Sequence, residues 1–180
     1  RSLSCRVLNE GRRAVRKKLV AGNWKMHGSR SMAAALASDI AAGMPASVDA
    51  VVFPPFPYIA ELAAQHAGSG LGFGGQDVSE HEGQGAYTGE VSAAMLQDVG
   101  AQWTLVGHSE RRQYHHESDE LVARKFAAAR AGGLTPVLCV GETLAQREAG
   151  ETEAVIARQL LAVLALNGVA CFDTAVIAYE

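Results

Sequence analysis

The sequence predicts an α/β domain built on a parallel β-sheet. Short apolar runs alternate along the chain with Ala-rich stretches of helical length. Aromatic residues make up only 6% of the chain and hydrophobic residues 48%, so the core must be mainly aliphatic. Such a core suits close helix–strand packing better than an aromatic-rich all-β sandwich. The 180 residues are enough for one domain with a substantial core.

Six strands are expected, each a short apolar run bounded by turn residues. They cover about 18–23, 49–53, 71–75, 103–106, 134–139 and 174–179. Because helical segments separate them, neighbouring strands should run parallel. The residues by themselves leave two architectures open, a (β/α) barrel and an open doubly wound sheet.

The helices are expected from capping and termination signals. They cover 29–40, 55–66, 92–99, 118–131 and 151–166, with a further helix start at 109–112. The segment from Ser118 has acidic residues in its first turn and ends at two glycines, as favoured by the helix dipole and by C-terminal capping. Thr143 and Gln146 match a capping box.

The charge is distributed unevenly. Residues 1–18 carry seven Lys or Arg and one acid, whereas the rest carries nine basic and eighteen acidic side chains. Residues 1–16 are therefore predicted to be a basic, disordered extension, and 17–180 the folded domain. A basic arm for nucleic acid or an anionic surface, or a mitochondrial transit peptide, are the alternatives. The acidic body argues against nucleic acid as its main partner.

The cysteines and the hydropathy indicate a cytoplasmic protein without a membrane partner. Cys5, Cys139 and Cys171 are odd in number and lack CxxC spacing, which favours reduced thiols, the last two in the core. No apolar stretch approaches the ~18 residues that span a bilayer.

Polar side chains follow three of the expected strands. Asn23 and Lys25 follow the first, His108 follows the fourth, and Glu180 follows the sixth. The carboxyl ends of parallel strands share one edge of the sheet, so these four side chains should converge. A carboxylate at such a tip is a candidate general base.

His108 also precedes a helix start at Ser109. The positive end of a helix dipole disfavours a second positive charge, so the imidazole should be neutral and able to donate a hydrogen bond to a carbonyl oxygen.

Other patterns are given less weight. Residues 70–75 match GxGxxG but overlap a strand, so we interpret these glycines as close packing rather than dinucleotide binding. His115, His116 and Glu117 are expected in a solvated loop, because no further ligand at suitable spacing joins them, and no metal site is predicted. His27, His66 and His81 are expected at the surface.

Five blocks of the sequence, in order, resemble triosephosphate isomerase. They are Ala21-Gly22-Asn23-Trp24-Lys25-Met26, Gly75-Gln76-Asp77 with Gly85-Ala86-Tyr87-Thr88-Gly89-Glu90, Val106-Gly107-His108-Ser109-Glu110-Arg111-Arg112, Cys139-Val140-Gly141-Glu142 and Ile177-Ala178-Tyr179-Glu180. The resemblance covers roughly 17–180. It implies a (β/α)8 TIM barrel, here incomplete with about six β-α units, and a homodimer.

The resemblance also implies the reaction of glycolysis and gluconeogenesis that interconverts dihydroxyacetone phosphate and glyceraldehyde 3-phosphate, without cofactor or metal. Glu180 would be the base, His108 the neutral electrophile, and Lys25 a cation for the substrate's charge. Asn23 would bind a substrate oxygen.

Three further roles follow from the same resemblance. Glu110 and Ser109 would support the site, and Thr88 would reach into the partner subunit at the dimer interface. The family's lid, its phosphate-binding turns and strands seven and eight have no counterpart in these 180 residues. We therefore expect this chain alone to be inactive. The alternatives are an inactive barrel that acts only as a dimerising module, and an unrelated open-sheet nucleotide or phosphate binder.

Overall fold

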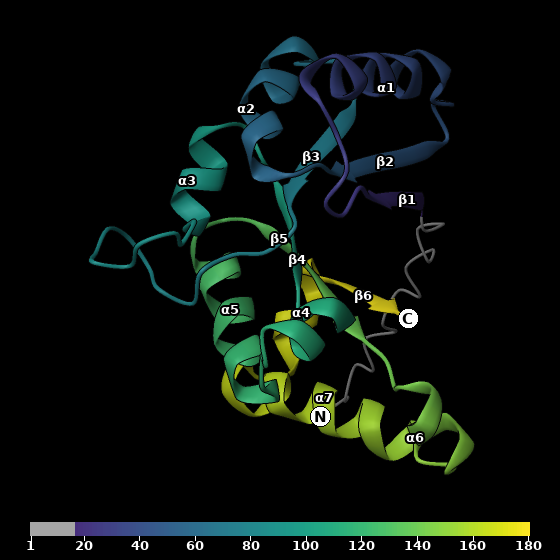
Figure 1. The fold of residues 1–180 in the computed structure, drawn as a ribbon, viewed down its shortest axis with the longest axis vertical. Helices are drawn as coiled ribbons and strands as arrows, with labels where there is room; N and C mark the ends of the chain where they lie inside the picture. Colours follow the sequence, from purple (N-terminus) through teal and green to yellow (C-terminus); the bar gives the residue numbers. More distant parts are fainter. Residues whose placement is uncertain (1–16) are drawn as a thin grey trace, which may run out of the picture.

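The computed structural model describes residues 17–180 (Figure 1). The predicted disordered extension, residues 1–16, lies outside the described residues, and so does Cys5. The strands are β1 (Lys18–Asn23), β2 (Val48–Phe53), β3 (Leu71–Gly75), β4 (Trp103–Val106), β5 (Thr135–Val140) and β6 (Val176–Tyr179). The helices are α1 (Arg30–Gly43), α2 (Phe56–Gln65), α3 (Ala93–Asp98), α4 (Ser109–Tyr114), α5 (Asp119–Ala131), α6 (Leu144–Glu148), α7 (Thr152–Asn167) and the 3₁₀ helix η1 (Val169–Thr174).

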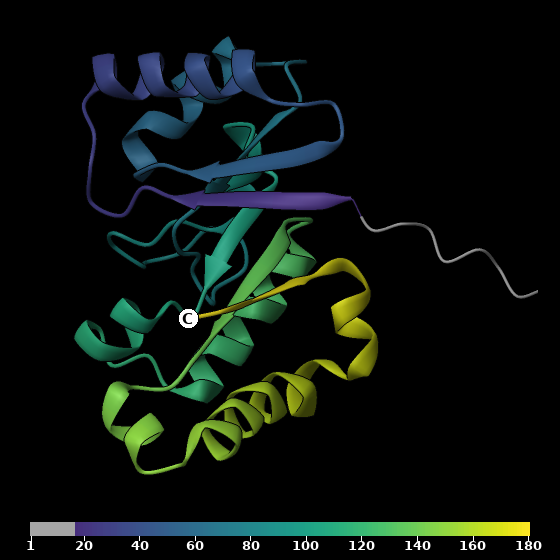
Figure 2. The ribbon, with the colours of Figure 1, turned by 90° about the vertical axis from the view of Figure 1, so that its right-hand side faces the viewer.

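The order of the strands decides between the two architectures. All six lie in one parallel sheet in the order β1-β2-β3-β4-β5-β6. A doubly wound sheet reverses its strand order at a switch point, whereas a barrel adds each strand beside the previous one. The sheet also curls as it proceeds (Figure 2). The fold is therefore an incomplete (β/α) barrel: among the described residues, β1 pairs only with β2 and β6 only with β5.

Alternate residues of each strand enter different cores. Val137 and Cys139 of β5 join an inner cluster, whereas Leu138 and Val140 join an outer one. The inner cluster consists entirely of strand residues: Leu19, Val51, Phe53, Trp103, Leu105, Val137, Cys139, Val176 and Ala178. Because no helix contributes to it, the inner face is the barrel side of the sheet.

The helices cover the outer face in two groups (Figure 1). At one end, α1 and α2 pack on β2 and β3 through a cluster that includes Ala33, Ala37 and Leu62. At the other end, α3, α5 and α7 pack on β4 and β5 through Leu96, Phe126 and Val163. Small Ala side chains let these helices approach the sheet closely, as the Ala-rich composition predicts.

The glycines of β3 serve close packing, in line with the interpretation from sequence. A Cβ atom at Gly74 would lie 2.4 Å from the Phe53 ring and 2.8 Å from the Trp103 carbonyl oxygen. A Cβ atom at Gly75 would lie 2.8 Å from Leu96. Side chains at these positions would therefore push neighbouring strands and α3 away.

All the predicted strands and helices are present, and two of their bounds differ by more than one residue. Helix α1 continues to Gly43 instead of ending near residue 40. The last strand starts at Val176 instead of residue 174, because residues 169–174 form η1. Gly168 ends α7 at φ 70°, and η1 then buries Cys171 in the outer core. Ser29, Ser92 and Ser118 are the N-caps of α1, α3 and α5, and the expected capping box of Thr143 and Gln146 is formed.

Two further expectations concern the core and the membrane. Cys139 and Cys171 are both buried and free, as predicted. Within residues 17–180, no helix combines the length and the apolar character required to cross a membrane.

Candidate active site

The tips of β1, β4 and β6 bring predicted site residues together at one edge of the sheet. We call this edge the rim, and it comprises Lys25, His108, Ser109, Glu110 and Glu180. Lys25 Nζ lies 2.7 Å from Glu110 Oε1, and Glu110 Oε2 lies 3.7 Å from His108 Nδ1. On the other side of the imidazole, His108 Nε2 lies 3.3 Å from Glu180 Oε1. Ser109 Oγ donates to Glu180 Oε2 at 2.5 Å. An ammonium, an imidazole and a carboxylate that are far apart in the sequence thus form one continuous polar chain.

The position of His108 defines the protonation of its ring. His108 is the N-cap of α4, and its Nδ1 accepts a hydrogen bond from the Glu110 backbone N–H at 3.2 Å. A nitrogen that accepts carries no proton, so the proton of the neutral ring lies on Nε2. That N–H is the one directed to the Glu180 side, and the side chain is only 13% exposed.

Lys25 and Glu110 stabilise each other's charged forms. The hydrogen bond and the charge of Glu110 raise the pKa of Lys25. The hydrogen bond from Lys25 lowers the pKa of Glu110, against a smaller opposing effect of burial. Both side chains remain about half exposed, so the ammonium is accessible to an anionic ligand.

Glu180 lies over β5. Its backbone N–H donates to the Val140 carbonyl at 3.0 Å, which extends the β5–β6 pairing by one residue. A Cβ atom at Gly141 would lie 2.6 Å from the Glu180 carbonyl oxygen, so only glycine fits there. Beneath it, burial and then the charge of Glu180 raise the pKa of the Cys139 thiol to about 12. The thiol is therefore protonated at neutral pH, and it is not a nucleophile.

A hollow of about 950 Å³ lies beside the carboxylate of Glu180. Ser109, Cys139, Gly141, Gln146 and Gln159 are among the residues that line it. The rim thus has open space next to its candidate base.

Asn23 and Thr88 occupy different surroundings. The Asn23 side chain points back to its own turn, where Oδ1 accepts from the Lys25 N–H at 2.9 Å. Thr88 lies on an exposed turn, closed by a hydrogen bond from Glu90 N to Tyr87 O at 3.1 Å. No hydrogen bond or ion pair within residues 17–180 joins Thr88 to the rim residues of its own chain.

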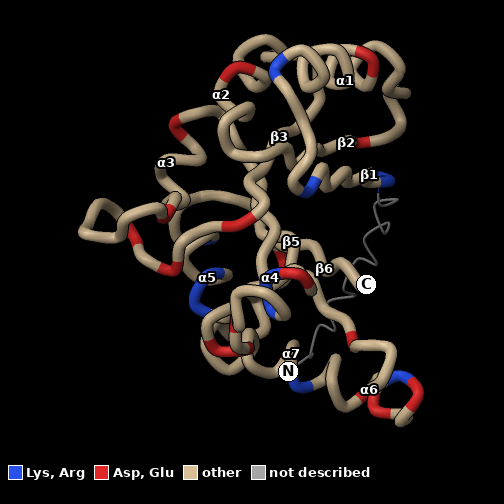
Figure 3. The backbone as a smooth tube through the Cα atoms, viewed as in Figure 1, with Lys and Arg blue, Asp and Glu red and all other residues tan. Residues whose placement is uncertain are grey.

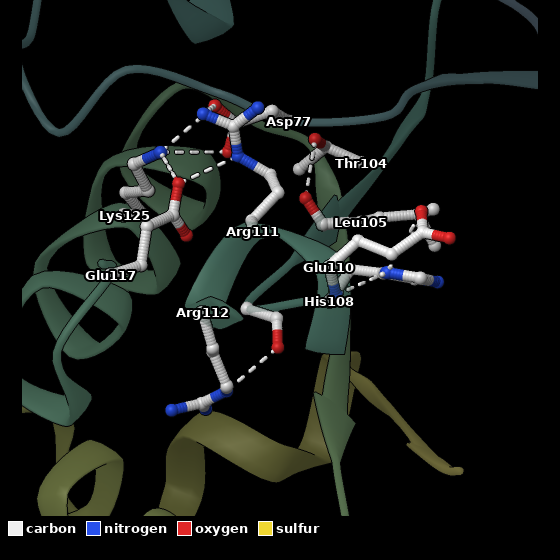
Figure 4. Close-up of polar contacts among 10 residues, drawn as sticks. Asp77, Thr104, Leu105, His108, Glu110, Arg111, Arg112, Glu117 and Lys125 are labelled. Carbon is white, nitrogen blue, oxygen red and sulfur yellow. Dashed lines mark hydrogen bonds and ion pairs between the residues drawn. The ribbon is translucent and has the colours of Figure 1, made fainter. Parts of the chain in front are cut away.

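Behind the rim lies a buried ion cluster that the sequence did not indicate, formed by Asp77, Arg111, Glu117 and Lys125 (Figure 4). Lys125 Nζ lies 2.8 Å from Asp77 and 2.6 Å from Glu117, and Arg111 contacts the same two carboxylates at 2.9 and 2.6 Å. The side chains of Lys125 and Glu117 are 6% and 2% exposed. The assignment of Glu117 to a solvated loop was therefore wrong, although its neighbours His115 and His116 are exposed.

Positively and negatively charged residues lie close to one another around α4, α5 and α6 (Figure 3). Arg112 and Arg158 share Asp119 at 2.5 and 2.8 Å, and Arg147 pairs with Glu142 at 2.8 Å. The Arg147 hydrogen bond lowers the pKa of Glu142 to about 2.

Two histidines differ from their predicted surface positions. His66 is half-buried beside Phe73, with ring centres 6.2 Å apart, and its Nε2 has no hydrogen-bond partner among the described residues. His81 stacks on Tyr87 with ring centres 3.6 Å apart. In the described part of the chain, no group of three or more His, Cys, Asp or Glu is placed to hold a metal ion.

Comparisons with a family profile and with curated proteins point to the same family. The triosephosphate isomerase family profile matches residues 18–180. A curated triosephosphate isomerase from Stenotrophomonas maltophilia K279a is 65% identical over 167 residues, which is 92% of this chain and 66% of that protein. Those from Xanthomonas campestris pv. campestris 8004 and Xylella fastidiosa M23 are 62% and 59% identical over the same number of residues. Each match covers 92% of this chain, and it covers 66% of the Xanthomonas protein and 67% of the Xylella protein. This chain thus spans about two thirds of the length of the curated relatives it matches.

Proposed function

The chain belongs to the triosephosphate isomerase family, and from that premise we propose that its natural protein interconverts dihydroxyacetone phosphate and glyceraldehyde 3-phosphate. The reaction moves one hydrogen between two neighbouring carbons and has no net oxidation. It needs a base for the carbon-bound proton and a donor for the carbonyl oxygen. The observation that carries the proposal is the contact between Glu180 and the N–H side of the His108 imidazole.

In the proposed mechanism, Glu180 takes a proton from the carbon next to the carbonyl group. The electron pair of that C–H bond forms the carbon–carbon double bond of an enediolate, and the negative charge develops on oxygen. His108 Nε2–H donates to that oxygen, and Lys25 stabilises its charge. His108 Nε2 gives its proton to the former carbonyl oxygen and takes up the proton of the hydroxyl group on the neighbouring carbon, which becomes the new carbonyl. Glu180 returns the carbon-bound proton to the former carbonyl carbon, which completes the isomerisation and restores both groups.

The supporting groups act through the residues that they contact. Glu110 accepts from the Lys25 ammonium and donates its backbone N–H to His108, so it fixes two proposed catalytic groups at once. Ser109 donates to Glu180 and holds the carboxylate beside the imidazole. Asn23 is the proposed ligand of a substrate oxygen.

The test is replacement of the proposed base in the natural full-length protein. Glu180→Gln keeps the size of the side chain but removes its basicity, so kcat should fall by roughly 10²–10⁴-fold. The matched control is Glu61→Gln, which makes the same change at an exposed position on α2 and should leave kcat unchanged. Near-normal turnover by Glu180→Gln would refute the proposed mechanism.

A homodimer and a cytoplasmic location belong to the same proposal. Thr88 is exposed on a protruding turn, which supports its proposed role in a partner subunit's site. Thr88→Arg should shift the natural protein toward monomer in sedimentation equilibrium, whereas Thr174→Arg, at an exposed residue at the end of η1, should not. An unchanged dimer in Thr88→Arg would contradict this assignment. Free thiols at Cys139 and Cys171 support a reducing compartment.

A further inference from the structure

Lys25 has an unfavourable backbone conformation. Its φ is 52°, in the left-handed region that side-chain-bearing residues rarely occupy. Such a conformation is energetically unfavourable and persists only where surrounding contacts enforce it. Lys25 follows β1 by two residues, so this turn determines the direction in which the ammonium leaves the sheet.

Gln76, at the tip of β3, holds this turn. Its Nε2 donates to the Lys25 carbonyl oxygen at 2.8 Å and to the Phe53 carbonyl oxygen at 2.8 Å. Phe53 ends β2, and its carbonyl also accepts from the Trp24 N–H at 3.1 Å. One side-chain amide therefore links the tips of three neighbouring strands.

Both hydrogens of the Gln76 amide are used in these two bonds. A carboxylate at this position has no donor and would face two carbonyl oxygens. Asn is one methylene shorter, and Met has the right length but no N–H. The site therefore requires the length and the two donors of glutamine.

The second contact on this turn comes from a residue of β1, close to Lys25 in sequence. Asn23 Oδ1 accepts from the Lys25 N–H at 2.9 Å, so the backbone of Lys25 is bound on its N–H side by Asn23 and on its carbonyl side by Gln76. With both sides fixed, the side chain extends to Glu110, where Nζ lies at 2.7 Å.

We propose that Gln76 is a positioning residue that holds Lys25 in its left-handed conformation and thereby directs the ammonium to the rim. This inference rests on the proposed function, because the importance of the Lys25 position depends on a substrate charge there. Gln76 acts through Lys25 and not on the substrate.

The experiment uses Gln76→Met in the natural full-length protein. A displacement of about 1 Å in a catalytic group lowers activity by roughly 10²-fold, so kcat/KM should fall by roughly 10- to 100-fold. Gln65→Met is the matched control, because Gln65 is exposed on α2 and its side chain hydrogen-bonds to Glu61, away from the rim. It should leave kcat/KM unchanged.

A double-mutant cycle separates positioning from a general structural role. In a Lys25→Met background, Gln76→Met should have no further effect on kcat/KM, because the group that it positions is already missing. A crystal structure of Gln76→Met should show Lys25 at negative φ. Full additivity of the two substitutions, or φ unchanged in the variant, would overturn the inference.

The result is also distinguishable from failure of the proposed function. If Glu180→Gln abolishes turnover while Gln76→Met leaves kcat/KM intact, the inference on Gln76 is wrong and the proposed function stands. If Glu180→Gln remains active, the proposed mechanism fails whatever Gln76 does.

Discussion

Helix α4 sends charged side chains to two different networks, on opposite sides (Figure 4). Glu110 pairs with Lys25 at the rim, where both side chains are about half exposed. The next residue, Arg111, enters the cluster with Lys125 and Glu117, which are almost completely buried. The rim pair is accessible to a ligand, whereas Lys125 and Glu117 are removed from solvent, and Arg111 ties α4 to them. Similar ion pairs are therefore exposed in one place, where we propose that Lys25 binds substrate, and buried in the other.

The largest expected effect is a loss of folding stability in Lys125→Met. It leaves Asp77 and Glu117 buried with only Arg111 between them, and the loss of one partner in a buried ion pair costs roughly 3–5 kcal/mol. The free energy of unfolding from urea titration should fall by that amount. Lys17→Met, which removes an exposed pair with Asp49, should cost about 1 kcal/mol or less. Equal effects of the two substitutions would erase the distinction between buried and exposed pairs.

A smaller effect, on rate rather than stability, should come from Glu110→Gln. The amide removes the charge that raises the pKa of Lys25, so this pKa should return toward its ordinary value. We expect kcat/KM to fall by roughly tenfold while the melting temperature hardly changes, because the pair is exposed. Steady-state kinetics and calorimetry on the natural protein measure both. A large drop in melting temperature would show that the rim pair is structural.

The smallest effect is a difference in titration within the buried cluster. Burial raises the pKa of Asp77, and Lys125 offsets this only in part. For Glu117, burial also acts to raise the pKa, but hydrogen bonds from Lys125 and Arg111 prevail and lower it. Carboxyl ¹³C resonances should therefore titrate above pH 3.8 for Asp77 and below pH 4.5 for Glu117.

The shifted pKa values of Asp77 and Glu117 make the folding stability depend on pH in opposite directions. The folded-state pKa of Glu117 lies below its unfolded value, so its contribution is complete above about pH 4.5 and is lost as the pH falls. The folded-state pKa of Asp77 lies above its unfolded value, so its contribution is present below about pH 3.8 and is lost as the pH rises. A Glu117 resonance that titrates above 4.5 would contradict the account of the cluster.

Sequence alone located the rim because strand tips in a parallel sheet share an edge. Lys25, His108 and Glu180 each lie within two residues of the end of a strand, so their convergence depends mainly on strand direction. The apolar runs alone left the choice between a barrel and a doubly wound sheet open, since each run predicts a strand but not its neighbours, and the family resemblance predicted the barrel. The consecutive strand order in the structure resolved it.

The buried cluster and Gln76 could not be predicted in the same way. Lys125 and Asp77 are 48 positions apart, and Gln76 and Lys25 are 51 apart. No periodic pattern joins such residues, and polar residues next to helices or strand tips usually face solvent. Burial of Glu117 depends on how α4 and α5 pack, and η1 arises from the way Gly168 redirects the chain after α7.

The most direct test of the account is the protonation of His108 in the natural full-length protein at neutral pH. Because Nδ1 accepts from the Glu110 N–H, the ¹⁵N resonances should show the ring proton on Nε2 and none on Nδ1. In the proposed mechanism, such a ring donates to a substrate oxygen while Glu180 acts as the base. Resonances of a doubly protonated ring, or of a neutral ring protonated on Nδ1, would contradict the account.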